Sequence, residues 1–314
     1  ALSPGLDMRR RHPDAMRAFT AIRVVARRPQ VEGPFLARRF ACPTSNLLMD
    51  EPRFELDSSF NESFTSFDGN ARVTTQRIIA GANGLAAMTG NVRFTGTPKA
   101  AYGRIDVAAQ RSRLGPIYAE RTRIDGRYLI GASAGTLSLI ADYSAEDAEL
   151  APSVLAGVTE PLAAADNTPI GPIATAMSNA IRRSASAFDA SGTIRMVNFP
   201  GGGAARVETA EGRSVTGARV RVCGGDGVTY YWPSSRLRVD GLIQMAGGGL
   251  PQGRVLLRQP RSGAPLSGMA RFAPYQVGAS RLALEPIRFR ASADGATNFN
   301  TVALLDGPFP DGRV

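Results

Sequence analysis

Apolar and charged residues alternate along much of the chain, most clearly where arginine alternates with valine, leucine or isoleucine. The pattern occurs in ARVRVCGG at 218–225, SRLRVDGLIQM at 235–245, GRVLLRQP at 253–260 and EPIRFRASADG at 285–295. Because successive side chains of a strand point to opposite faces, a period of two predicts one apolar and one charged face. Similar stretches occur earlier, as NVRFTG, GRIDVAAQ and ERTRIDGRYLI, and turn-forming residues separate them.

The alternation is interrupted once. Residues 151–190 are rich in alanine, serine and proline, and the acidic segment SAEDAEL at 144–150 is expected to start this insertion. A helix is predicted at 172–188, with Pro172 in its first turn. Its apolar face would contain Ile173, Met177, Ile181, Ala185 and Phe188. We therefore divide the chain into an irregular lead-in (1–20), a first β segment (21–150), a helical insertion (151–190) and a second β segment (191–314).

This pattern predicts a mainly β fold: a long, antiparallel, twisted and amphipathic sheet that forms an open groove, with one short helical insertion. The predicted apolar face of the first β segment contains Val92, Phe94, Ile105, Val107, Leu137 and Leu139. That of the second contains Val220, Val222, Leu237, Val239, Ile243, Met245, Val255, Leu257, Leu282, Leu284, Ile287 and Phe289. The alternative is a closed sandwich, in which two sheets bury these residues against each other.

Charge changes this interpretation little. The net charge is +10, and Lys99 is the only lysine among 37 basic residues. Cationic side chains can bind nucleic acid, but these arginines are spread over all the strands and no motif of stacking aromatic residues accompanies them. We therefore expect a solvated outer face and no nucleic-acid partner.

No catalytic or metal-binding constellation is convincing. GASAG at 131–135 matches the letters of a serine nucleophile motif, but a strand is predicted after it, where that motif requires a helix. The only histidine, His12, precedes Ser133 in the lead-in. Carboxylate pairs such as Glu146 with Asp147 are typical of solvated strand ends, and the glycine clusters at 201–203, 224–227 and 247–249 are typical of turns and bulges. We expect no enzyme activity, no cofactor and no metal.

Two cysteines, Cys42 and Cys223, lie far apart in strand-like surroundings. Buried free thiols are favoured because cysteine packs as a small hydrophobic residue. Whether the two form a disulfide stays open, because spacing alone does not show that their Cα atoms are close.

An apolar face that is not closed onto a second sheet needs an apolar ligand. About 30 methylenes of a phospholipid, at ~0.8 kcal/mol each, make exposure of its chains to water cost about 25 kcal/mol. A continuous apolar track would remove that cost.

Six stretches carry a resemblance to a known family. They are GPFLARRFACP, FNESFTSFDG, AQRSRLGPIYAERTRIDGRYLIG, GTIRMVNFPGGGAARVETAE, GGDGVTYYWPSSRLRVDGLIQMAGGGLPQGRV and LEPIRFRASADG. Through them, residues from about 30 to 314 resemble the AsmA-like bridge-type lipid-transfer proteins of the Gram-negative envelope, and specifically the YdbH branch.

The resemblance implies a periplasmic protein whose full-length form is anchored in the inner membrane by an N-terminal helix. Its implied function is to carry phospholipid between the inner and outer membranes along a β-groove. This chain would be an internal segment, with partners at the outer membrane unknown and no catalytic residue to assign. The alternatives are a closed β-sandwich secreted or adhesion-type binding protein, or a β-rich protein that acts on polysaccharide.

Overall fold

The fold is mainly β and antiparallel, as expected from the alternation. The computed structural model describes residues 17–42, 47–80, 83–114, 117–131, 136–163, 171–232, 234, 236–261, 264–277, 279–291, 297–300 and 303–306. Nineteen strands belong to one sheet, which does not close on itself, and β18, β19 and β22 form a small second sheet. The closed sandwich is therefore not the architecture of the described residues.

The strands up to the helical insertion are β1 (Arg17–Ala18), β2 (Ala21–Val25), β3 (Arg28–Leu36), β4 (Arg39–Cys42), β5 (Leu47–Asp50), β6 (Arg53–Phe60), β7 (Phe67–Ala80), β8 (Asn83–Thr97), β9 (Ala100–Leu114), β10 (Ile117–Ile130) and β11 (Leu137–Leu150). Strand β1 lies in the expected lead-in, and residues 1–16 lie outside the described residues. The SAEDAEL segment continues β11 and does not start the insertion, so that expectation was wrong.

The strands after the insertion are β12 (Phe188–Phe199), β13 (Gly202–Ser214), β14 (Arg219–Trp232), β15 (Arg236–Ala246), β16 (Gly253–Arg258), β17 (Leu266–Phe272), β18 (Tyr275–Val277), β19 (Ser280–Leu284), β20 (Ile287–Ala291), β21 (Thr297–Asn300) and β22 (Ala303–Asp306). The chain divides into two compact units, which we describe separately. The first contains Ala1–Glu146 and Ile194–Gly203, and the second contains Asp147–Thr193 and Ala204–Val314.

In the first unit, long neighbouring strands pair in antiparallel register from β7 to β10. Strand β6 pairs with residues 67–74 of β7, and β5 pairs with residues 77–80. Strands β5 and β6 together therefore span the length of β7. Strands β3 and β4 pair in the same way with β6 and β5.

A line of irregularities crosses these strands, and we call it the crease. Where the chain crosses this line, two buried or half-buried residues are three positions apart, and at least one exposed residue lies between them. The pairs are Met49 and Pro52, Thr75 and Ile78, Leu85 and Met88, Ala109 and Ser112, and Ala119 and Thr122. Because strict alternation would put residues three apart on opposite faces, each strand shifts its alternation by one position at the crease.

Backbone geometry marks the same line. Glu51, Ala87 and Arg111 have φ angles of 49°, 46° and 52°, in the left-handed region that non-glycine residues seldom adopt. The hydroxyl groups of Ser112 and Thr122 are hydrogen-bonded to each other across the crease. These features indicate that the strands bend at the crease.

The core of the first unit lies at the crease. Met49, Val73, Met88 and Ala109 form a buried cluster. Phe40, Ile78 and Leu85 pack against it from one side of the crease, and Phe54, Val92 and Val107 pack from the other. Side chains from both sides of the crease therefore contact one cluster. The face of the strands that carries this cluster is concave along the crease.

In the second unit, β14, β15, β16, β17, β20 and β21 pair successively and antiparallel. Strand β14 contains a bulge between Cys223 and Gly227, where Gly224, Gly225 and Gly227 have positive φ angles. Pro274 and Pro286 separate β17 from β18 and β19 from β20. Proline cannot donate a backbone hydrogen bond, which explains why the ladder is interrupted there.

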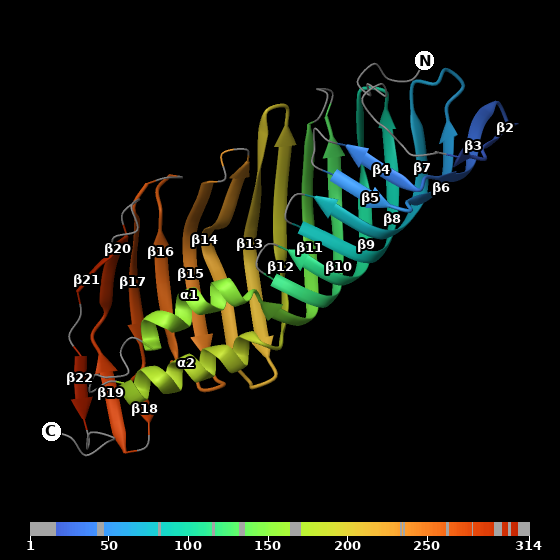
Figure 1. Ribbon diagram of the computed structural model, residues 1–314. Coiled ribbons are helices and arrows are strands. Elements are labelled where there is room, and N and C mark those ends of the chain that lie inside the picture. Colours follow the sequence, from blue (N-terminus) through green and yellow to red (C-terminus); the bar gives the residue numbers. More distant parts are fainter. Residues whose placement is uncertain are drawn as a thin grey trace. The chain divides into compact units, whose positions relative to one another are not determined.

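The helical insertion consists of two helices, α1 (Pro152–Ala163) and α2 (Gly171–Ala185). Both cross one face of the strands of the second unit (Figure 1). Ile173 and Ala180 of α2 are each only 1% exposed, and Phe188 begins β12 instead of ending the helix as expected. Among the described residues, neither helix is long and apolar enough to cross a bilayer.

Candidate apolar binding surface

Strand register brings the predicted apolar residues of the first unit onto one face. Val92 lies directly opposite Ile105 on β9, and Val107 lies opposite Ile124 on β10. Phe94 shares a row with Gly69 and Gly103. Residues directly opposite each other in antiparallel strands point to the same side, so these positions form one surface. We call it the apolar face of the first unit.

An open pocket of about 280 Å³ lies on this face. It is lined by Val92, Ile105, Tyr128, Ile130, Leu137 and Leu139. All of these except Tyr128 and Ile130 were predicted from the sequence to lie on the apolar face. Those two belong to the alternating stretch ERTRIDGRYLI, and extending the period of two to its end would have found them. The Tyr128 hydroxyl donates a hydrogen bond to the carbonyl oxygen of Arg93, 3.2 Å away.

The side chains of this face are not covered as a core would be. Val92, Phe94, Ile105, Val107, Leu137 and Leu139 are all half-buried. Ile130, at the rim of the pocket, is 44% exposed. A surface of this kind offers an apolar ligand area from which water can be removed.

In the second unit, the predicted apolar residues also lie opposite each other on neighbouring strands. We call the surface that they form the apolar face of the second unit. Val220 lies opposite Met245, and Val222 lies opposite Ile243, which in turn faces Val255. The remaining predicted positions in this sheet pair with small or apolar residues: Val239 with Val228, Leu237 with Tyr230, Leu257 with Gly241 and Gly268, Ile287 with Ala270, and Phe289 with Gly268. Among them, the side chains described are half-buried apart from Val220, which is exposed.

Leu282 and Leu284 are placed differently from the other predicted residues. They lie in β19, which pairs with β18 and β22 in the small sheet. Leu282 is buried, Leu284 is half-buried, and Leu282 lies opposite Tyr275. The break at 285–286 separates them from Ile287 and Phe289, and the period of two does not continue across it.

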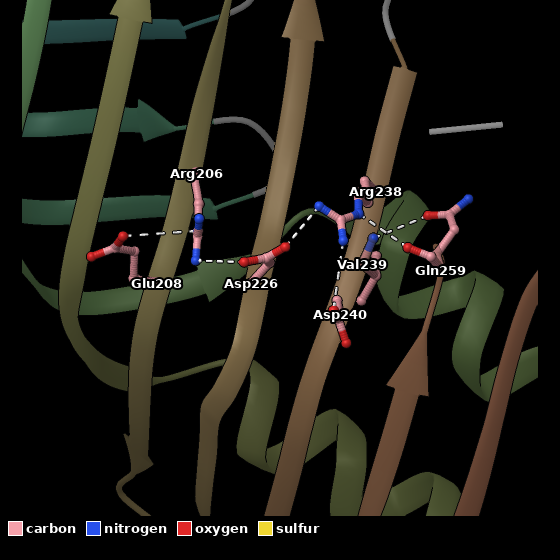
Figure 2. A network of polar contacts seen from close by, with 7 residues as sticks. All are labelled: Arg206, Glu208, Asp226, Arg238, Val239, Asp240 and Gln259. Carbon is pink, nitrogen blue, oxygen red and sulfur yellow. Dashed lines mark hydrogen bonds and ion pairs between the residues drawn. The ribbon is translucent and has the colours of Figure 1, made fainter. Parts of the chain in front are cut away.

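The two helices lie on the apolar side of the second unit. Figures 1 and 2 view the sheet from opposite sides, and in Figure 2 the helices are behind strands whose near side carries a polar network. On α2, Ser184 is hydrogen-bonded to Thr216 in the loop before β14. A Cβ atom at Gly249, in the loop after β15, would lie 3.3 Å from the Cβ of Ala180. The insertion therefore borders the apolar face at the ends of these strands.

The polar network of Figure 2 joins β13, β14 and β15. Asp226 accepts contacts from Arg206 at 3.0 Å and from Arg238 at 2.8 Å. Arg238 also donates to the carbonyl oxygen of Gln259 at 3.0 Å, and the side-chain oxygen of Gln259 accepts a bond from the backbone N–H of Val239. The network surrounds the bulge at Asp226, so its role here is to hold an irregular strand in place.

The structure does not bring the other candidate residues together into a catalytic or metal-binding site among the described residues. In the part of the chain that the structure describes, no group of three or more potential ligands could hold a metal ion. Glu146 pairs with Arg121 at 2.7 Å, and Ser133 lies outside the described residues. Cys223 has a free thiol but is half-buried, not buried as expected, and the side chain of Cys42 is not described.

No protein-family model, curated protein or solved structure matches this chain.

Proposed function

We propose that this chain is a segment of a periplasmic bridge-like protein that carries phospholipid between the inner and outer membranes along its apolar face. The observation that supports this proposal is an open sheet whose apolar side chains stay half-exposed and border an apolar pocket on the first unit. Burying each methylene of a chain there contributes about 0.8 kcal/mol. Many weak, non-directional contacts of this kind suit a ligand that moves along a surface.

The proposal includes an inner-membrane anchor in the full-length protein and no chemistry on the cargo. Its charged face would keep the segment in solution, because arginine keeps its guanidinium group solvated while its stem lies on the sheet. The apolar face would hold acyl chains, and the lipid head groups would stay at its rim.

Two adjacent residues allow a matched test. Ile130 lines the pocket and is 44% exposed. Leu129 is 49% exposed, and its side chain points to the other face of the sheet, where it lies opposite Tyr102. Ile130→Asp and Leu129→Asp therefore make the same change, at nearly the same exposure, on opposite faces. Neither position is in the buried cluster at the crease, so both variants should fold.

The experiment is purification from a Gram-negative host without added lipid, followed by native mass spectrometry and lipid extraction. We expect phospholipid to copurify with the parent chain and with Leu129→Asp, and to be reduced in Ile130→Asp. Circular dichroism would check that the sheet is retained. A folded parent chain that is free of lipid, or equal lipid in both variants, would count against the proposal.

A further inference from the structure

On the charged face of the second unit, one row of residues crosses four strands. Arg221 on β14 lies opposite Gln244 on β15, which lies opposite Arg254 on β16, which lies opposite Arg271 on β17. With Arg219, these residues line a cleft of about 550 Å³. We call Arg219, Arg221, Arg254 and Arg271 the arginine row.

The charges of this row are poorly compensated. Arg254 and Arg271 face each other directly, and like charges in that position repel. Within the residues that the structure describes, neither guanidinium group has a hydrogen bond or an ion pair. Their same-face neighbours two positions along each strand are Leu256 and Met269 on one side, and uncharged residues on the other.

The cleft contains one carboxylate, Glu211, which is already engaged. Arg213 contacts it at 2.8 Å. That hydrogen bond and the charges of Arg213, Arg221 and Arg219 lower the pKa of Glu211 below its usual value. One carboxylate among four arginines leaves the cleft strongly positive.

Two other groups of arginines on the charged faces have carboxylates beside them. In the first unit, Arg104 lies opposite both Arg93 and Arg127, and the cleft that Arg93 and Arg104 line also contains Asp68, Asp106 and Asp125. In the second unit, Asp226 lies between Arg206 and Arg238. Arginines that lie opposite each other occur in both units. The arginine row differs because its cleft has only one carboxylate, Glu211, which is already paired with Arg213.

An apolar row runs directly beside it on the same charged face. Cys223 lies opposite Leu242, which lies opposite Leu256, which lies opposite Met269, and all four are half-buried. These residues break the alternation on the face where polar residues are expected. A cationic row next to an apolar row fits a ligand with an anionic group and a short apolar part.

We propose that the arginine row binds a phosphate group, carried either by a small amphiphile or by a free phosphate compound. Guanidinium groups stay protonated and form paired hydrogen bonds with phosphate oxygens. The bound anion would supply the missing counter-charge between Arg254 and Arg271. This site lies on the face opposite the apolar face, so it does not depend on the proposed lipid track.

The test is isothermal titration calorimetry of the full 314-residue chain at low ionic strength, with inorganic phosphate and with dihexanoyl phosphatidic acid below its micelle concentration. The variant Arg254→Gln/Arg271→Gln removes the facing pair. Its control, Arg93→Gln/Arg104→Gln, removes another facing pair and the same net charge. We expect at least a tenfold loss of affinity, about 1.4 kcal/mol, in the first variant and little change in the control.

The two probes identify the source of the phosphate. Tighter binding of the phosphatidic acid supports an amphiphile that also uses Leu242, Leu256 and Met269, and equal binding supports a free phosphate compound. Equal losses in both variants would show non-specific attraction to a basic surface. That result, or no binding of either probe by the parent chain, would overturn the proposal.

Discussion

The aromatic ring of Phe94 lies over the backbone of Gly69, its direct partner on β7. A Cβ atom at Gly69 would come within 2.8 Å of the Cζ atom of Phe94, and it would also collide with the carbonyl oxygen of Asp57 on β6. The rings of Phe67 and Phe94 are 6.0 Å apart. On a concave face, a residue without a side chain thus makes room for an aromatic ring from the next strand.

We therefore expect Gly69→Ala to destabilise the fold by about 1–3 kcal/mol, because either the ring or the β6 backbone must move. Gly84→Ala is the matched control, since the nearest atom to its added Cβ would be the carbonyl oxygen of Ile78 at 3.5 Å. Chemical denaturation would compare the two. Equal midpoints would show that the face at Gly69 is looser than the structure indicates.

Asp226→Asn should lower the free energy of unfolding by about 1–2 kcal/mol, because it removes the charge that Arg206 and Arg238 share. The comparison is Asp106→Asn, which weakens the exposed pair with Arg123 and should cost no more than about 1 kcal/mol. Thermal melting at low and high salt measures both. A larger effect at Asp106 would contradict a structural role for the network.

Met88→Ala should cost about 2–5 kcal/mol, because this side chain is 7% exposed in the cluster at the crease. Met245→Ala, at a half-buried position of the second unit, should cost clearly less because water already reaches the side chain. The readout is urea unfolding. Similar losses at the two positions would mean that the crease is not the centre of the core.

Burial raises the pKa of Tyr128 above its usual value of 10.0. Because the folded state favours the neutral phenol, protonated Tyr128 contributes to the free energy of unfolding. This contribution is complete below pH 10 and is lost as the pH rises through the raised pKa. The difference in tyrosinate absorbance between the parent chain and Tyr128→Phe, recorded as the pH rises, would locate the titration of Tyr128. An acyl chain in the pocket should raise this pKa further, and no change on adding lipid would contradict occupation of the pocket.

The apolar faces were predictable where strands alternate without interruption. Val92 and Ile105, or Ile243 and Val255, lie opposite each other because the strands keep a period of two on both sides of these residues. The arrangement needed only that period and the pairing of neighbours. Placing Leu282 with Ile287 needed more, because the break at Pro286 separates their strands.

A shift of alternation in β11, of the same kind as at the crease, explains why SAEDAEL was misassigned. In β11, Ala145 and Ala148 are buried, and Glu146 and Asp147 between them are exposed. Small residues three apart with acids between them imitate the spacing of a helix, so SAEDAEL looked like the start of the insertion. Helix α1 was missed because Gly157 and Pro161, two residues that disfavour a helix interior, stand within its sequence.

The crease also couples neighbouring strands to each other. On β8 and β9 the register is the same on both sides of Ala87 and Arg111, because neighbouring strands shift their alternation together. Deleting Ala87 alone would put the end of β8 out of phase with β7 and β9, turning Leu85 to the outer surface. Strand lengths here should therefore change only in concert, and a second deletion in a neighbouring strand would have to accompany the first.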